Sequence, residues 1–267
     1  MSEEKSGKFQ GKVTGRQILP AAASILCLAL VLSPIANVQA AELQILAGGG
    51  VAAPLRELAA QFESATGHKL VIRFGTTPEL IKMATTGGPF DLAVVPVDVM
   101  KDAAARARFA SGRMTGIARV GLGVAIRSGA ARPDISTPEA LKQTLLKAQS
   151  IASIPESSTG YLLARVFERL GITEAMKARI KPQPTPAQIV QSVATGETEL
   201  GVFLTNVLTA PGLDLVGPFP AELQLEVVYT AAAAADTKEA DAAKAFITYL
   251  TTPAATAVIK AKGMNPG

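Results

Sequence analysis

The sequence predicts an α/β protein of two lobes, each a mostly parallel sheet flanked by helices, with two crossover strands joining the lobes. First, short apolar runs alternate with amphipathic stretches of helical length, which is the pattern of a doubly wound parallel sheet. Second, this strand-then-helix series is built twice along the chain. Third, the long apolar runs Val120–Ile126 and Leu223–Tyr229 each follow one series, and we expect them to cross between the lobes.

The first forty residues are expected to lie outside the fold. Three lysines and Arg16 form a basic region, an uncharged and mostly apolar run follows from Ile18 to Leu32, and Val38-Gln39-Ala40 suits a cleavage site. This order is typical of a secretory signal peptide, and the apolar run is short for a membrane span. We therefore expect residues 1–40 to be removed on export to the periplasm.

The remaining chain is predicted to divide into two lobes. The first is expected to comprise residues 41–122 and 226–267, and the second residues 123–225. Both predicted crossover strands lie at these boundaries, so a hinge between the lobes is expected there.

Composition excludes several classes of function. The only cysteine, Cys27, lies in the predicted leader, so the mature chain has no disulfide, no thiol nucleophile and no thiolate metal site. The chain has no tryptophan, 4% aromatic residues and no basic run, which excludes a nucleic-acid partner. With a single histidine, His68, no metal or other cofactor is predicted.

The chain is organised around the stretch from Leu43 to Phe62. An apolar run ends in Gly48-Gly49-Gly50, and apolar side chains then recur at helical spacing from Val51. This is a strand, a tight turn and a helix start. The first backbone N–H groups of such a helix have no intrahelical partner and lie at the positive end of its dipole. The turn is therefore expected to offer a site for an anion or a polar ligand.

Two more strands complete the predicted first series. The strand 69–74 leads to Thr76-Thr77-Pro78, where Thr77 is the expected N-cap and Pro78 the first helical residue. Gly87-Gly88-Pro89 ends that helix. The strand 91–95 is apolar throughout, as expected for a central parallel strand covered on both faces.

The second series repeats this organisation. Thr137 is expected to cap a helix that begins at Pro138, and Thr185 precedes another helix in the same way. The other expected elements are the strands 150–154 and 200–204, a helix 161–170 after Ser157–Gly160, an alanine-rich join 230–235, and closing helices 236–250 and 253–262.

The candidate site lies at the carboxyl ends of the predicted strands, where open α/β sheets bind ligands. Small polar turns occupy four of these ends. We expect the following residues to contact the ligand: Gly49, Gly50, Thr76, Thr77, Ser158, Thr159, Gly160 and Asn206. Any one of these turns serves equally well as a helix cap. Because four of them are expected to face one cleft, the sequence predicts a small polar solute, and an anion in particular.

Several segments resemble the type II periplasmic solute-binding proteins, and in particular their molybdate-binding branch. The resemblance extends from Leu43 to Pro266. The matching segments are Ile45-Leu-Ala-Gly-Gly-Gly-Val51, Phe74-Gly-Thr-Thr77, Gly87-Gly-Pro-Phe-Asp91, Leu200-Gly-Val-Phe203 and Phe246-Ile-Thr-Tyr-Leu-Thr-Thr-Pro-Ala-Ala255. The resemblance implies the type II periplasmic binding fold, capture of a small solute, and an ABC permease as partner.

The resemblance also implies roles for particular positions. The ligand-binding serine of the family falls on Gly50, and a serine pair falls on Thr76-Thr77, whose second member binds the oxyanion. A backbone contact falls on Thr159. Two positions depart from the pattern, because a second backbone contact falls on Pro186, which has no N–H, and a binding tyrosine falls on Leu204. The expected ligand is therefore a molybdate-like oxyanion, a small organic anion or a small polar solute.

Two other classes of function have partial signals in the sequence. Gly48-x-Gly50-x-x-Ala53 matches a dinucleotide fingerprint, but the second strand ends at Gly75 without the acidic residue that the fingerprint requires. His68 falls in a predicted surface turn, remote from the strand ends, so it is not expected to be a general base. We therefore expect a monomeric binding protein and no enzyme. A sensor or scavenger that works without a transporter stays open as an alternative.

Overall fold

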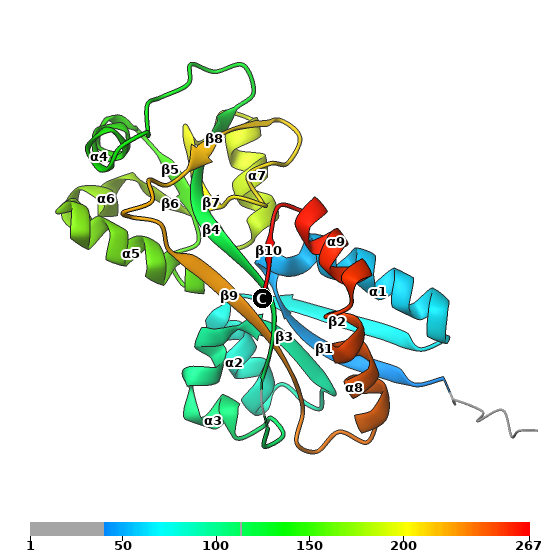
Figure 1. Ribbon diagram of the computed structural model, residues 1–267. Helices are drawn as coiled ribbons and strands as arrows, with labels where there is room; N and C mark the ends of the chain where they lie inside the picture. The colour runs from blue at the N-terminus through cyan, green and yellow to red at the C-terminus, as the bar shows by residue number, and fades with distance from the viewer. Residues whose placement is uncertain (1–39, 113) are drawn as a thin grey trace, which may run out of the picture. The chain divides into compact units, whose positions relative to one another are not determined.

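The computed structural model describes residues 40–112 and 114–267 (Figure 1). Apart from Ala40, the predicted signal peptide lies outside the described residues. Within these ranges the chain forms the predicted α/β fold, in which helices flank a mixed sheet of two parts. No helix in the described ranges combines the length and the apolar character needed to cross a membrane.

The first part of the sheet has β1 at its centre. Strand β1 (Glu42–Gly48) pairs in parallel with β2 (Lys69–Gly75) and β3 (Leu92–Pro96), and β3 pairs antiparallel with β9 (Glu226–Ala233). A short 3-10 turn, η1 (Gly49–Val51), joins β1 to α1, and a second, η2 (Val97–Lys101), follows β3. The helices are α1 (Ala52–Thr66), α2 (Thr77–Thr86), α3 (Ala103–Arg106), α8 (Ala240–Tyr249) and α9 (Pro253–Ala261).

Helices cover both faces of this part, as its apolar strands require. Leu43 and Ile45 of β1 belong to a buried cluster with α1, α8 and α9, whereas Leu46 belongs to a second cluster with α2 and α3. Successive strand residues point to opposite faces, so β1 contributes to both clusters. Figure 1 shows the two groups of helices on opposite sides of β1–β3.

Strand β4 (Thr115–Arg127) runs through both parts of the sheet. Its first half pairs with β9, and from Leu122 onward it pairs with β7 (Leu200–Leu204) and β8 (Leu213–Pro218). At the point of change, the side-chain amide of Gln224 accepts a hydrogen bond from the Leu122 N–H (2.8 Å) and donates one to the Leu122 carbonyl (3.0 Å). The change of partners lies one residue from the predicted lobe boundary, and the boundaries themselves stay a prediction.

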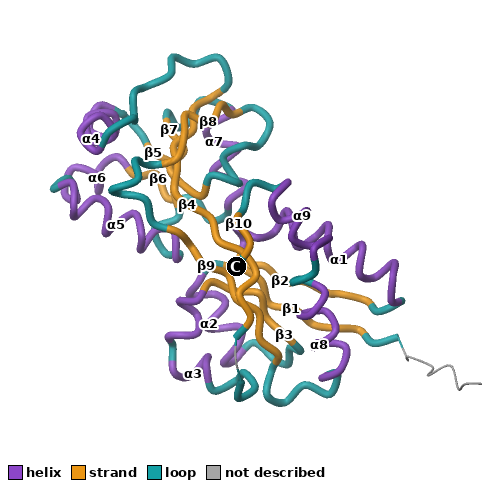
Figure 2. Tube along the Cα trace, viewed as in Figure 1, coloured by secondary structure: helices purple, strands orange, loops and turns teal. Residues whose placement is uncertain are grey.

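The second part of the sheet continues from β4 through β7 to β5 (Ile151–Ser153) and β6 (Ile180–Pro182). Strands β7, β5 and β6 are mutually parallel; β7 and β5 are predicted strands, whereas β6 is not. The helices of this part are α4 (Pro138–Lys147), α5 (Ser158–Leu170), α6 (Thr173–Arg179) and α7 (Pro186–Ala194). Figure 2 shows α4, α5 and α6 on one side of these strands and α7 on the other. A two-residue strand, β10 (Asn265–Pro266), pairs with β4.

Three local predictions are wrong. The alanine-rich segment is not a join, because residues 230–233 continue β9, where they pair with β3. The helix after Ser157 begins at Ser158 and not at Tyr161, since the Ser157 hydroxyl accepts from the Gly160 N–H and caps it. His68 is buried and not a surface residue, because its Nδ1 accepts from the Ala41 N–H and its ring stacks on Phe62.

Candidate ligand-binding cleft

Four helical segments begin at the carboxyl ends of strands and form the candidate site. The η1–α1 segment follows β1, α2 follows β2, α5 follows β5, and α7 follows β6. Each start carries backbone N–H groups that lack an intrahelical acceptor, and each adds the positive end of a helix dipole. The contacts between these starts, described next, join the two parts of the sheet.

The first contact joins α2 to α5 through two buried hydroxyl groups. The Thr77 and Ser158 hydroxyl oxygens are 2.9 Å apart, and either can donate. The Ser158 backbone N–H also donates to the Thr77 hydroxyl oxygen, at 3.0 Å. Both side chains are buried. The sequence named both residues as site residues, and the fold brings them together.

Neighbouring residues leave these two hydroxyls free for this contact. Thr77 was predicted to be the N-cap of α2, which is wrong: the N-cap is Thr76. The Glu79 carboxylate accepts hydrogen bonds from the Thr76 N–H (2.7 Å) and hydroxyl (3.0 Å), which fixes the helix start one residue earlier. The N-cap of α5 is Ser157, so the Ser158 hydroxyl is likewise not needed to cap its helix.

The second contact joins the η1 turn to the loop after β7. The Asn206 side-chain nitrogen donates to the Gly50 carbonyl, at 2.9 Å. The Asn206 side-chain oxygen is buried and has no hydrogen-bond partner among the described residues. Buried polar atoms are seldom left unpaired, so this oxygen is available to a donor on a ligand or to a water molecule.

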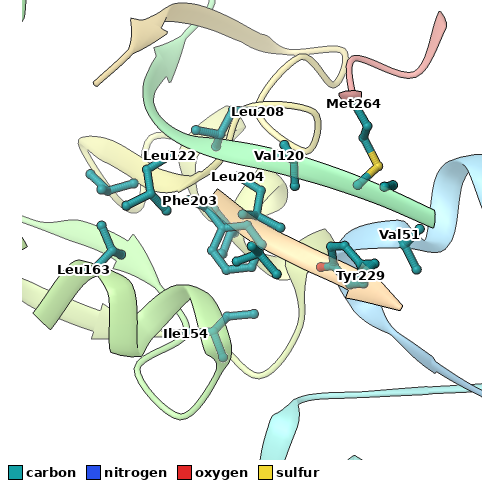
Figure 3. Packing of buried hydrophobic residues seen from close by; sticks show 14 of the residues in the cluster. Val51, Val120, Leu122, Ile154, Leu163, Phe203, Leu204, Leu208, Tyr229 and Met264 are labelled. Carbon is teal, nitrogen blue, oxygen red and sulfur yellow. The ribbon is translucent and has the colours of Figure 1, made fainter. Parts of the chain in front are cut away.

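The third contact is the close packing of Tyr229, Leu204 and Pro186 against the glycines of the turn. A Cβ placed on Gly50 would lie 2.3 Å from the Tyr229 hydroxyl oxygen and 2.4 Å from Leu204 Cδ1. A Cβ on Gly49 would lie 3.2 Å from Pro186 Cγ. Only glycine lets these groups approach the turn, which explains the residue type at position 50. Figure 3 shows Leu204 and Tyr229 among the buried residues here.

The other predicted site residues have different surroundings. Thr76 is occupied by Glu79, as described, and its N–H is therefore not free for a ligand. The Gly160 N–H donates to the Ser157 hydroxyl at 3.1 Å, so it too serves a cap. Thr159 is buried in the first turn of α5, beside Ser158.

Tyr229 is the residue at this site that sequence reasoning missed. It lies on β9 opposite Pro96 of β3 and Ala118 of β4, and only 2% of it is exposed. Burial raises the pKa of the Tyr229 hydroxyl above its ordinary value, so the phenol is neutral and keeps its proton. The signal available in the sequence was its place at the end of a predicted crossover strand, because such strands line the space between lobes.

The cleft is closed in this structure by contacts between the two parts of the sheet. Two open hollows of about 610 and 460 Å³ lie elsewhere, against α4 and α6, and neither includes a residue of the cleft. In the described part of the chain, no cluster of histidine, cysteine, aspartate and glutamate side chains is placed to hold a metal ion.

Two sheet regions that share β4, with helix starts meeting between them, define a two-lobed solute-binding protein. Comparison with known proteins identifies the family. The profile of the bacterial extracellular solute-binding proteins matches residues 43–265, and the chain belongs to this family.

Relatives within this family carry different names. A protein named aconitate isomerase, from Pseudomonas sp, is 35% identical over 236 residues, which cover 84% of this chain and 87% of that protein. The molybdate-binding protein ModA of Azotobacter vinelandii is 30% identical over 239 residues, which cover 84% and 90%. The fold is that of the type II periplasmic binding proteins. The solved structure of the Azotobacter vinelandii periplasmic molybdate-binding protein superposes with a TM-score of 0.71 at 22% identity, and the match covers 84% and 99% of the two chains.

Proposed function

We propose that this chain is an exported periplasmic protein that captures a small anion between its two lobes and delivers it to an ABC permease. The observation that carries the proposal is the buried contact of Thr77 with Ser158. It joins the starts of two helices from different parts of the sheet through groups that can donate to an anion. The family to which the chain belongs supports the same role.

Neutral donors are sufficient for such a ligand. Micromolar binding corresponds to about 8 kcal/mol, and a hydrogen bond to a charged group is worth roughly 1.5–3 kcal/mol. A helix N-terminus adds roughly 0.3–1 kcal/mol. The hydroxyls of Thr77 and Ser158, the Asn206 amide and the helix-start N–H groups that are not already engaged can therefore reach this range without a lysine or arginine.

Ligand entry and release would require the lobes to separate. In the closed arrangement the Thr77 and Ser158 hydroxyls satisfy each other, and an anion would accept from both in place of that contact. Separation at β4, where the strand changes partners next to Gln224, is the simplest hinge motion that exposes them. The ligand then favours the closed state, because only in that state does the anion accept hydrogen bonds from both lobes.

Thermal unfolding of residues 41–267 with a ligand panel tests the proposal. The panel consists of molybdate, tungstate, sulfate, phosphate, citrate, aconitate and succinate. A ligand at 100 times its Kd stabilises the folded state by about 2.7 kcal/mol, which is a shift of several degrees for a domain of this size. A shift with at least one anion is expected. No shift with any of these small anions, together with a shift for a nucleotide tested beside them, would contradict the proposal.

A transport role and a sensing role differ in the protein that the ligand-loaded chain binds. A transport role is expected to show as binding of the loaded protein to a permease of the ABC class, whereas a sensor would bind a membrane kinase. Sedimentation of the purified chain tests the accompanying prediction that it is a monomer.

An enzymatic role is a second candidate, because the relative named aconitate isomerase is 35% identical. Such an isomerisation moves a proton between carbon atoms and needs a base. The groups that meet in the cleft are hydroxyls, an amide and a neutral phenol, and the neighbouring Glu79 carboxylate is engaged by the N–H and hydroxyl of Thr76. Proton NMR of cis-aconitate in D₂O with the protein decides the matter: growth of the trans signals with time would show an enzyme, and unchanged signals a binding protein.

A further inference from the structure

We propose that Tyr229 selects the ligand of this cleft, and that the ligand class is a small organic carboxylate, not a bare inorganic oxyanion. In this assignment the Tyr229 hydroxyl donates to a carboxylate, and Leu204 and Pro186 contact the carbon atoms of the same molecule. The inference rests on the proposed capture of an anion between the lobes.

The first step is the position of the phenol ring along the glycine turn. A Cβ on Gly48 would lie 2.7 Å from Tyr229 Cε1, and a Cβ on Gly50 would lie 2.3 Å from the hydroxyl oxygen. The ring therefore runs along the turn from Gly48 to Gly50, with its hydroxyl at the end nearest η1. The turn itself offers only backbone groups, and the side-chain polar groups that reach it are this phenol and the Asn206 amide, whose nitrogen donates to the Gly50 carbonyl.

The second step is the chemistry of that donor. A buried tyrosine hydroxyl usually has a hydrogen-bond partner, since leaving it without one costs free energy. A tyrosine with its ordinary pKa of about 10 is already protonated at neutral pH, and burial raises the pKa of the Tyr229 hydroxyl further. It can therefore donate to an anion and does not repel one.

The third step is the composition of the facing wall. Leu204 of β7 and Pro186 of α7 approach Gly50 and Gly49 with carbon atoms. Neither group can donate a hydrogen bond, and Pro186 also has no backbone N–H. The hydroxyls of Thr77 and Ser158 form a separate contact, between α2 and α5. The cleft thus has one contact region of two hydroxyls, and one in which the Tyr229 phenol and the Asn206 amide are set beside the carbon atoms of Leu204 and Pro186.

The fourth step compares two kinds of anion with this arrangement. A tetrahedral oxyanion has oxygen on every side, so some of its oxygens would lie against Leu204 and Pro186 without a donor, which is costly for a charged group. An organic acid has carboxylate oxygens at its ends and carbon between them. It can place one carboxylate at Thr77 and Ser158, another at Tyr229, and its carbon atoms against the apolar wall.

Calorimetric titration of residues 41–267 with citrate, trans-aconitate, succinate, molybdate and sulfate tests both the ligand class and the role of Tyr229. At least one organic acid is expected to bind tenfold or more tightly than either oxyanion. Tyr229→Phe is expected to lower the affinity for that organic acid by roughly tenfold to a hundredfold, the range for a lost hydrogen bond to a charge. The matched control is Tyr249→Phe, because the Tyr249 hydroxyl donates to Gln61 on α1 and does not face the cleft. The affinity of this variant for the organic acid is expected to equal that of the wild type.

The outcomes separate the inference from the function on which it rests. If an oxyanion binds and the organic acids do not, the ligand class is wrong but anion capture stands. If an organic acid binds and Tyr229→Phe leaves its affinity unchanged, the role of Tyr229 is wrong. If no anion binds the wild type, the proposed function itself fails. Thermal unfolding of Tyr229→Phe without ligand shows whether a loss of affinity reflects a loss of folding.

Discussion

Thr77 and Ser158 lie 81 residues apart in the sequence, yet Ser158 meets the Thr77 hydroxyl with both its own hydroxyl and its backbone N–H. The pair is buried and joins the first turns of α2 and α5. A contact of this kind holds two helix starts at hydrogen-bonding distance while leaving polar groups that a ligand can take over. Three of the predictions below follow from the contacts of this cleft, and a fourth from the burial of Tyr229.

Thr77→Ala is expected to weaken binding of the anion found in the thermal panel by tenfold or more, because a hydrogen bond to charge is worth roughly 1.5–3 kcal/mol. Thr77→Ser keeps the hydroxyl and is expected to retain most of the affinity. Calorimetric titration measures both.

Thr137→Ala is the control for that experiment. Thr137 caps α4 by accepting from the Ala140 N–H, in the same Thr-Pro-Glu sequence, but lies outside the cleft. Its replacement is expected to lower the free energy of unfolding by about 1 kcal/mol and to leave affinity unchanged. Equal losses of affinity in the two alanine variants would show that Thr77 is not a ligand contact.

Asn206→Ala is expected to favour separation of the lobes in the absence of ligand. The substitution removes the bond to the Gly50 carbonyl, which contributes about 0.5–1.5 kcal/mol to the closed arrangement. Small-angle scattering of the unliganded protein should then give a larger radius of gyration. Gln143→Ala, which removes a bond within α4, should leave the radius unchanged. An unchanged radius in both variants would mean that this bond does not hold the lobes together.

Gly50→Ala is expected to destabilise the folded protein by about 1–3 kcal/mol, the usual cost of overpacking. The added carbon has no room between the Tyr229 hydroxyl and Leu204. Gly112→Ala places the same carbon in open space and should change the free energy of unfolding little. Urea unfolding compares the two, and a neutral Gly50→Ala would show that the turn is looser than the structure describes.

Stability is expected to fall at high pH through Tyr229. Its pKa is raised by burial, so above the unfolded-state value of about 10 the unfolded chain loses a proton that the folded chain keeps. The stabilising contribution is complete below that pH and is lost as pH rises toward the folded-state pKa, by about 1.4 kcal/mol per pH unit. Urea unfolding at pH 8 and pH 11 should show a smaller loss for Tyr229→Phe than for the wild type. An identical loss in both would contradict the prediction.

Local signals allowed much of the fold to be predicted. Thr137 and Thr185 cap the helices expected after them, and the apolar runs become buried strands. The error at Thr77 was also local, since Glu79 three residues after Thr76 is the spacing of a capping box and marks Thr76 as the cap. Short strands such as β6, with exposed Lys181 and Pro182, lack the apolar pattern that reveals a strand.

The cleft could be predicted only in outline. The turns at the strand ends identified Gly50, Thr77, Ser158 and Asn206, because each is a small polar or glycine residue at a helix or loop start. Tyr229 could not be placed there, since its approach to Gly50 depends on the register of β9 against β3 and β4. The burial of His68 depends in the same way on its contacts with Ala41 and Phe62.

The pairing of β3 with β9 has a consequence for the order in which the molecule forms. Val94 of β3 lies opposite Ala231, so the first part of the sheet is complete only when residues near the end of the chain have joined it. Until then one edge of β3 has unsatisfied backbone groups that other chains can pair with. Contacts this distant in sequence also slow folding. Until β9 pairs with β3, a chain that is still folding is therefore open to aggregation along this edge, and a chaperone that covers the edge would protect it.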